Sequence, residues 1–193
     1  TCFVCAMNKK EKNFTKTVWK HYEKHGRHRL LWRKTKNPYK ILISEIMCQQ
    51  TQVDRVFPKY ASFIKKFPKV TTLASAPLGE VLRQWQGLGY NRRAKMLHAC
   101  AKEIVGEYKG AFPKTYEELK VLPGIGPYTA GAIMAFSYNK PVPIIETNIR
   151  TVYLHHFFKN KTDVTDTEIY RLIDITLDHG NPREWYWALM DYG

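Results

Sequence analysis

The sequence predicts an all-α protein, and three observations support this fold class. Nearly every segment after residue 12 repeats its apolar side chains at helical spacing, and short Pro or Gly punctuation separates the segments. No alternating pattern of useful strand length competes with them. The chain has 193 residues, of which 44% are hydrophobic, enough to bury a real core. We therefore expect helices throughout, without internal repeats or a clear linker.

The predicted helices begin with residues 14–26, where apolar side chains such as Phe14 share one face and Gly26 is a natural stop. A second, mostly apolar helix runs from Asn37 and Pro38. The later segments follow the same spacing, each bounded by Pro, Gly or polar residues. In chain order, the predicted helices are residues 14–26, 37–53, 53–67, 71–77, 78–86, 91–108, 129–139, 146–158, 165–180 and 183–193.

The charge balance favours a polyanionic partner. Lys and Arg total 31 against 17 acidic residues, which gives a net charge of +14. A soluble protein whose charge only prevents aggregation is the alternative. Because the basic residues are spread along the chain, we expect a basic face on a folded domain and no basic tail. No apolar run is long enough to span a bilayer.

The four cysteines are too few and too irregular for a disulfide scaffold. With no secretory segment before them, they indicate an intracellular, reducing setting. Cys2 and Cys5 form only half of a zinc site, and we expect Cys48 and Cys100 to be buried thiols. The sequence therefore predicts no protein-bound metal.

Residues 119–150 contain the most informative motif, a glycine hairpin followed by a helix and an acidic residue. Gly124 and Gly126 flank Ile125, so the turn can adopt backbone angles and close approaches that a Cβ would obstruct. Pro127 suits a first helical position, and the hairpin amides together with this helix start predict a phosphate clamp. Taken alone, such a glycine pair is more typical of a plain turn, and it is the flanking residues that favour the phosphate clamp.

Two acidic residues are candidates for chemistry. Glu45 lies in an otherwise apolar helix, where desolvation would raise its pKa and make it a proton donor near neutral pH. Glu146 opens a helix after an apolar stretch. The structural alternatives are a solvent-facing glutamate for Glu45 and a helix cap for Glu146. Together, one acid and one carboxylate fit the logic of glycosidic bond cleavage.

Residues 122–152, LPGIGPYTAGAIMAFSYNKPVPIIETNIRTV, resemble the helix-hairpin-helix and Gly/Pro-rich loop of the DNA glycosylases that include MutY and endonuclease III. Residues 30–53 and 85–104 are similar to segments of the MutY-like branch. The resemblance extends from about Phe14 to Gly193. Within it, QQT after the acidic helix and GLGY before a basic helix are more specific than the hairpin, which many DNA-binding proteins share.

The resemblance implies a single catalytic region, residues 1–193, with a two-lobed all-α fold and an active-site cleft between the lobes. Residues of about 13–36 and 140–193 would form one lobe, and about 37–139 the helix-hairpin-helix lobe. Such a protein bends duplex DNA, flips one nucleotide out of the stack and hydrolyses its N-glycosidic bond.

The resemblance also implies individual roles. Glu45 matches the acid that protonates adenine, and Arg33 matches a residue lining the base pocket. Gln50 and Tyr90 match residues that enter the base stack, although Tyr90 could also be simple core. The DNA-binding residues implied are Gln49, Gln50, Tyr90, Leu122, Gly124, Ile125, Gly126 and Thr129.

Tyr128, with Glu45 and Glu146, completes the implied catalytic set. Bifunctional members of the family carry a lysine at the position of Tyr128, which forms a Schiff base and cuts the strand. Tyrosine has no amine for this step, so the sequence indicates a monofunctional enzyme that leaves an abasic site.

The sequence departs from the family pattern at three places. Glu146 stands where aspartate is usual, and its extra methylene displaces the carboxylate. Trp187 replaces a glutamate that contacts adenine, which weakens adenine specificity because tryptophan offers only an N–H. The chain stops at Gly193, where many relatives continue into a four-cysteine iron–sulfur loop, so it is either a cluster-free member or a fragment, and we expect no cofactor bound by these residues. The separate C-terminal domain that reads 8-oxoguanine is missing too.

The leading hypothesis is a MutY-like DNA glycosylase that removes adenine opposite 8-oxoguanine or guanine. A glycosylase for thymine or uracil mispaired with guanine is the first alternative. A lesion-DNA binder impaired by Glu146 is the second, and a plain architectural protein is the third. We expect a monomer that acts inside the cell on double-stranded DNA with a mismatch or lesion, without a membrane partner.

Overall fold

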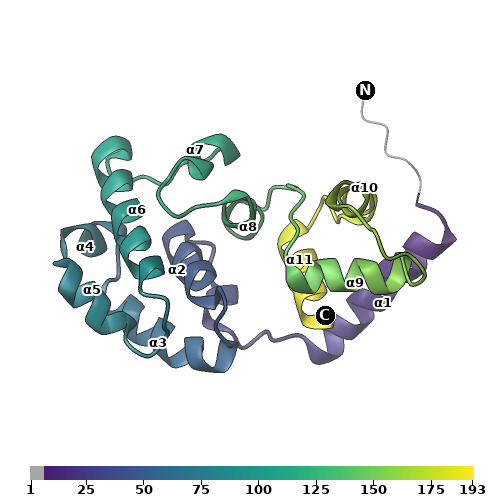
Figure 1. Ribbon diagram of the computed structural model, residues 1–193, viewed down its shortest axis with the longest axis horizontal. Coiled ribbons are helices and arrows are strands. Elements are labelled where there is room, and N and C mark those ends of the chain that lie inside the picture. The colour runs from purple at the N-terminus through teal and green to yellow at the C-terminus, as the bar shows by residue number, and fades with distance from the viewer. Residues whose placement is uncertain (1–6) are drawn as a thin grey trace. The chain divides into compact units, whose positions relative to one another are not determined.

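The computed structural model describes residues 7–193 and confirms the all-α fold class (Figure 1). Eleven α-helices and one 3-10 turn account for the regular structure of these residues, and they contain no strand. In chain order the elements are α1 (Lys9–His25), η1 (Leu31–Lys34), α2 (Pro38–Cys48), α3 (Val53–Lys66), α4 (Val70–Ser75), α5 (Leu78–Trp85), α6 (Arg92–Tyr108), α7 (Tyr116–Lys120), α8 (Pro127–Tyr138), α9 (Thr147–Phe157), α10 (Asp166–Thr176) and α11 (Pro182–Tyr192).

The chain divides into two compact units. The first combines the chain up to His28 with Asn139–Gly193, and the second is Arg29–Tyr138. Residues 29–36, which the sequence assigned to the lobe of the terminal helices, belong to the second unit. The reason is local packing, because Trp32 of η1 meets Tyr60 of α3 edge to face, with ring centroids 5.2 Å apart.

The first unit is held together by aromatic side chains. Helix α1 packs against α11 and α10, and α9 packs against both of these later helices (Figure 1). Phe14 lies at the centre, with its ring centroid 5.2 Å from that of Tyr153 and 6.0 Å from that of Trp185. All three side chains are buried, so this cluster joins α9, which carries Tyr153, to α1 and α11.

The second unit is built around α2 and α6. Helix α2 packs against α3 and α8, and α6 packs against α4 and α5 (Figure 1). Its core includes Phe63 and Trp85, both fully buried, with ring centroids 6.0 Å apart. The contact of α2 with α8 is the one that matters for the site, because Glu45 lies on the first helix and Tyr128 on the second.

Two helix boundaries and one whole helix illustrate where the structure differs from the sequence prediction. Helix α1 begins at Lys9, five residues early, because Asn8 and Glu11 form a capping box. Helix α2 ends at Cys48, where the apolar spacing predicted a helix to residue 53. Helix α7 was not predicted, and Thr115 caps it by accepting a hydrogen bond from the Glu118 amide.

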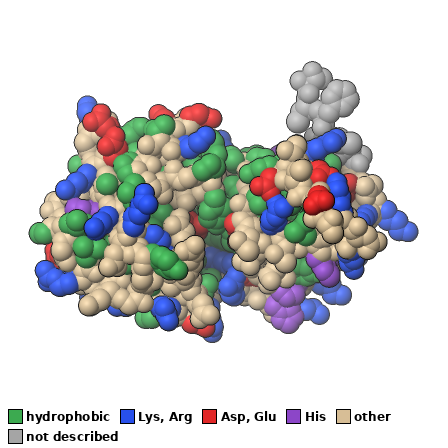
Figure 2. Space-filling view, viewed as in Figure 1, with side chains coloured by type: hydrophobic (Ala, Val, Ile, Leu, Met, Phe, Trp, Pro, Cys, Tyr) green, Lys and Arg blue, Asp and Glu red, His purple; other side chains and the backbone are tan. Residues whose placement is uncertain are grey.

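The basic side chains do not form a tail in the described residues. On the face shown in Figure 2, Lys and Arg side chains are dispersed over both units among hydrophobic and acidic ones. Among residues 7–193, no helix combines the length and apolar character needed to cross a membrane.

Candidate active site

Glu45 and Tyr128 meet within the second unit. The Tyr128 hydroxyl donates a hydrogen bond of 2.9 Å to Oε2 of Glu45. Both side chains are half-buried, and nearly all the neighbours of Glu45 on α2 are fully buried. Glu45 is therefore no solvent-facing residue of an amphipathic helix. A carboxyl group held by a phenol at the edge of an apolar helix is suited to proton transfer.

The glycine hairpin joins α7 to α8 and directs Tyr128 toward Glu45. Gly124 has a φ of +76°, and a Cβ built there would lie 2.7 Å from the Met96 Cβ. Both the turn and the close approach therefore require glycine at this position. Gly126 differs from the prediction, because its φ is not left-handed and a Cβ there would meet nothing within 4 Å.

The hairpin backbone is available to a ligand. Gly124 and Gly126 are both exposed, and within residues 7–193 neither amide donates a hydrogen bond to the chain. Pro127 follows as the first residue of α8. Free amides ahead of a helix N-terminus are the usual arrangement for binding an anion, and no internal contact of the chain explains the glycine at position 126.

The remaining predicted hairpin residues are buried. Leu122 and Ile125 are 3% and 5% exposed, so their side chains anchor the hairpin and only their backbone can face a ligand. Thr129 is buried as well, and its hydroxyl oxygen lies 3.5 Å from Nε2 of Gln49. This long hydrogen bond is weak, but it brings the loop after α2 next to the start of α8.

Glu146 caps α9 in the first unit. Its Oε1 accepts a 2.8 Å hydrogen bond from the Ile149 amide, and its backbone is extended, as is usual at an N-cap. The helix-cap role that the sequence analysis offered as an alternative for Glu146 is therefore present in the structure. The cap leaves Oε2 without a hydrogen bond among the described residues, and the helix N-terminus favours the negative charge.

The two residues predicted to enter the base stack share an unusual backbone. Gln50 has a φ of +52° and Tyr90 a φ of +48°, which costs about 1 to 2 kcal/mol each for residues with a Cβ. Both side chains are exposed, Tyr90 by 63%. Tyr90 is therefore not a core residue, and both side chains are presented to solvent from strained loops.

Arg93 is a site residue that the sequence reasoning missed. Its guanidinium contacts both loops, the one that carries Gln50 and the one that carries Tyr90. Nη1 donates to the carbonyl oxygens of Ile46 (3.0 Å), Met47 (3.0 Å) and Gln49, and Nη2 donates to Thr51 Oγ1 (3.0 Å), Leu88 O (3.1 Å) and Gly89 O (3.3 Å).

A sequence signal for Arg93 exists. It shares the face of α6 with Leu97, Cys100 and Ile104, which are all buried, so a guanidinium stands in an apolar stripe. Burial lowers the pKa of Arg93, while Cys48 and Tyr90 raise it; an arginine in this setting stays charged.

The two predicted base-pocket residues lie on separate units. Arg33 is half-buried in η1 of the second unit. Trp187 lies on α11 of the first unit, and its side chain is 4% exposed. The structure therefore places Trp187 as a buried side chain, and its role toward a base stays a prediction.

The cysteines and acidic side chains of residues 7–193 do not gather into a metal site of three or more ligands. Cys100 is buried, as predicted, and burial raises its thiol pKa to about 12. Cys48 is only half-buried. Cys2 and Cys5 lie outside the described residues, so their role stays a prediction.

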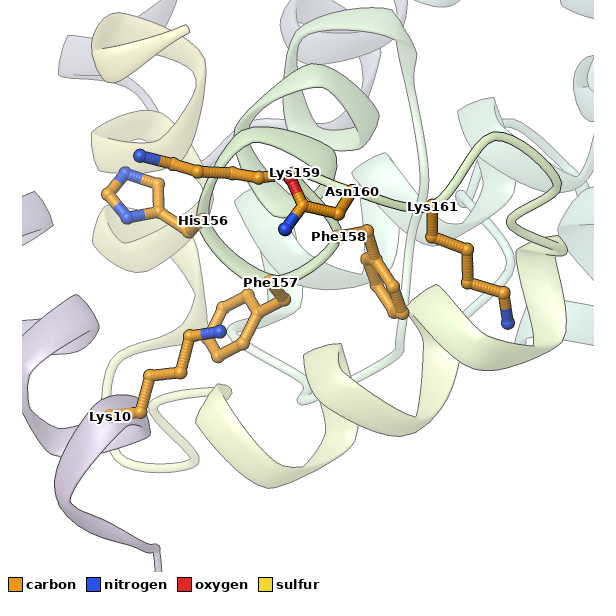
Figure 3. Close-up of a pocket in the computed structure, with 7 residues that line it drawn as sticks. All are labelled: Lys10, His156, Phe157, Phe158, Lys159, Asn160 and Lys161. Atoms are coloured by element: carbon orange, nitrogen blue, oxygen red, sulfur yellow. The ribbon is translucent and has the colours of Figure 1, made fainter.

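A separate hollow of about 470 Å³ lies in the first unit, at the C-terminal end of α9 (Figure 3). Two of its basic residues have partners within the chain: the Lys10 ammonium lies 5.2 Å from the ring centroid of Phe157, and Lys161 pairs with Glu168 at 2.5 Å. Basic side chains at a helix C-terminus also complement its dipole. The lining residues are Lys10, His156, Phe157, Phe158, Lys159, Asn160 and Lys161.

Comparison with known proteins places these features in a family. Residues 43–174 match the family model described as HhH-GPD superfamily base excision DNA repair protein. An adenine DNA glycosylase of Buchnera aphidicola subsp. Baizongia pistaciae is 40% identical over 184 residues, which cover 93% of this chain and 52% of the relative. An adenine DNA glycosylase of Mycolicibacterium smegmatis is 46% identical over 129 residues, covering 66% of this chain and 44% of the relative.

The chain thus spans about half the length of the curated relatives it matches. Among solved structures, that of a thermostable thymine-DNA glycosylase superposes with a TM-score of 0.87 at 26% identity. The superposition covers 96% of this chain and 86% of the other.

Proposed function

The chain belongs to the HhH-GPD superfamily of base excision DNA repair proteins, and we propose that it is a monofunctional DNA glycosylase. It extrudes a mispaired or damaged base from duplex DNA and hydrolyses the N-glycosidic bond. The observation that carries this proposal is the 2.9 Å hydrogen bond from Tyr128 to Glu45, next to a hairpin with exposed glycine amides. Adenine opposite 8-oxoguanine or guanine is the favoured substrate, because the similar curated proteins are adenine DNA glycosylases.

In the proposed reaction, Glu45 transfers a proton to the base as the bond between the base and C1′ of the sugar breaks. The base leaves with the bonding electrons, and the sugar becomes an oxocarbenium-like cation. Water then adds to C1′ and loses a proton, which leaves an abasic site and a free base. The Tyr128 hydroxyl orients Glu45 by donating to Oε2. Since a phenol forms no Schiff base, the strand stays uncut.

Glu146 is proposed to stabilise the sugar cation. Its cap bond to Ile149 fixes one carboxylate oxygen, so the other has a defined direction despite the longer side chain. Glu146→Gln keeps an oxygen for the cap but removes the charge, and should abolish base release while lowering stability by only about 0.3 to 1 kcal/mol. Glu146→Asp keeps both the charge and a good cap. An Asp variant that gains activity over an inactive wild type would favour the impaired lesion-DNA binder.

Thymine or uracil mispaired with guanine is the second candidate substrate. It is supported by the similarity to a thymine-DNA glycosylase at 26% identity across nearly the whole chain. Trp187 also bears on the choice, because an indole offers a base only an N–H donor. A pocket of that kind gives little support to recognition of the exocyclic amine of adenine.

The proposed partner is double-stranded DNA that contains a mismatch or lesion, bound by a monomer inside the cell. The net charge of +14 supports a polyanionic partner, and the exposed hairpin amides support phosphate contacts. We propose that these steps need no cofactor, since proton transfer and charge stabilisation are assigned to side chains of the described residues.

A panel of duplexes tests the proposed function. Five substrates carry A opposite 8-oxoguanine, A opposite G, T opposite G, U opposite G, and 8-oxoguanine opposite C. The proposal expects alkali-dependent cleavage on the adenine substrates and none on 8-oxoguanine opposite C. Preferred cleavage at T or U would favour the second candidate, whereas a borohydride-trapped covalent complex would contradict the monofunctional assignment.

A further inference from the structure

Two loops of the second unit each present one exposed side chain from a left-handed backbone. The loop at residues 49–52 joins α2 to α3 and carries Gln50, and the loop at residues 86–91 joins α5 to α6 and carries Tyr90. Residues other than glycine rarely adopt this conformation. Such strain persists only where the surrounding structure enforces it, and it is found mainly at functional sites.

Arg93 is hydrogen-bonded to both loops, beside the two strained residues. Nη1 donates to carbonyl oxygens at the end of α2 and in the first loop, while Nη2 donates to Thr51 and to the carbonyl oxygens of Leu88 and Gly89. The acceptors at the end of α2 and in the first loop lie 42 to 47 positions before Arg93 in the sequence. Those in the second loop lie only four or five positions before it.

The guanidinium also positions the tyrosine ring itself. The guanidinium carbon of Arg93 lies 5.4 Å from the ring centroid of Tyr90 and 5.5 Å from that of Trp85. Trp85 is buried and donates its indole N–H to the Gly89 carbonyl at 3.1 Å. The ring of Tyr90 is therefore held on one side by the fixed cation, although 63% of the residue is exposed.

We propose that Arg93 is a positioning residue that locks Gln50 and Tyr90 into one rigid pair before DNA binds. This proposal rests on the proposed function and deepens it. The pair would enter the base stack together and hold the gap left by the extruded base, without having to order two loops at that moment.

Only arginine meets the geometric requirement. Six acceptors and two aromatic rings surround one planar group with donors on both terminal nitrogens. Lysine keeps the positive charge, but its single ammonium cannot reach both sides of this network. Arg93→Lys therefore separates the positioning role from the electrostatic one.

The test uses three variants of the full chain. Arg93→Lys keeps the charge and breaks the network. Arg83→Met is the matched control, because it removes a positive charge from an exposed residue of the same unit and leaves the network intact. Thr51→Val removes one acceptor of Arg93 with little change of shape, and provides a milder variant should Arg93→Lys destabilise the fold.

Amide hydrogen exchange on the free protein measures the coupling directly. In Arg93→Lys, residues 49–51 and 87–91 should both lose protection, by about ten- to a hundredfold, the factor to which hydrogen bonds to a charged group convert. Thr51→Val should show a smaller loss in the same two segments, and Arg83→Met none. Loss of protection in one loop alone, or equal loss in the control, would overturn the proposal.

Fluorescence of 2-aminopurine placed beside a mismatch measures base extrusion, with salt dependence of binding as the second readout. Arg93→Lys should lose most of the fluorescence increase while its salt dependence stays that of wild type, because the phosphate contacts are unchanged. Arg83→Met should keep the increase. If wild type and Arg93→Lys extrude the base equally, the inference fails while the proposed function stands. If wild type extrudes no base from any duplex, both fail.

Discussion

Replacing the two hairpin glycines one at a time separates folding from DNA binding. Gly124→Ala places a methyl group in a left-handed residue, 2.7 Å from the Cβ of Met96. That atom belongs to the stem of a side chain on α6, so it cannot rotate away as the end of a long side chain could. Gly126→Ala meets no atom within 4 Å and has an ordinary backbone.

The cost of Gly124→Ala has two parts. The left-handed conformation costs about 1 to 2 kcal/mol for a residue with a Cβ, and the forced repacking against Met96 adds about 1 to 3 kcal/mol. The free energy of unfolding should fall by about 2 to 5 kcal/mol, which lowers Tm by roughly 4 to 20 °C in a chain of this size. Gly126→Ala should stay within about 0.5 kcal/mol of wild type.

DNA affinity should respond differently from stability: Gly126→Ala should fold like wild type but bind DNA more weakly. The new methyl group of Gly126→Ala would obstruct the exposed amide face, and loss of a hydrogen bond to a phosphate weakens DNA affinity by about ten- to a hundredfold. Thermal unfolding followed by circular dichroism gives stability, and fluorescence anisotropy with a labelled duplex gives affinity. The reasoning is wrong if Gly126→Ala destabilises the fold as much as Gly124→Ala, or if it binds DNA like wild type.

Three further predictions concern single side chains. Glu45→Gln should slow base release by about 10² to 10⁴-fold in single-turnover assays and leave duplex affinity unchanged; normal release would remove Glu45 as the proton donor. Tyr128→Phe removes the 2.9 Å hydrogen bond to Glu45 and should slow release by at least about tenfold, without any borohydride-trapped complex. Burial, followed by neighbouring positive charges, lowers the pKa of His156 below its ordinary 6.5, so the unfolded chain binds more protons there. Stability should therefore fall as the pH drops through 6.5, and His156→Gln should weaken this dependence in thermal unfolding measured from pH 5 to 8; an unchanged dependence would contradict the assignment.

The helices could be predicted from the sequence because their information is local. The stop of α1 at Gly26 is confirmed, and it needs only the spacing of apolar residues and the terminating glycine. The end of α2 was wrong because apolar spacing continues to Val53, whereas the chain leaves the helix at Cys48. At that exit Arg93, more than 40 positions away, donates to the Ile46 and Met47 carbonyl oxygens, a contact that periodicity does not reveal.

The sequence allowed us to predict which residues belong to the candidate site, but not which side chains they contact. Gly124 was expected in the turn, but its second reason, the Met96 stem, lies on another helix. Glu45 and Tyr128 were each assigned through a family resemblance, and their hydrogen bond joins residues 83 positions apart. Arg93 was overlooked because charged residues are read as surface residues, although its helical face is otherwise buried.

The most direct test of the glycosylase proposal is mass spectrometry of the products from a duplex with adenine opposite 8-oxoguanine. We expect wild-type protein to yield free adenine and an intact strand whose mass corresponds to one abasic site, and Glu45→Gln to yield neither. Unaltered adenine-containing strand after many hours with wild-type protein, on this duplex and on the mispaired pyrimidine duplexes alike, would contradict the account.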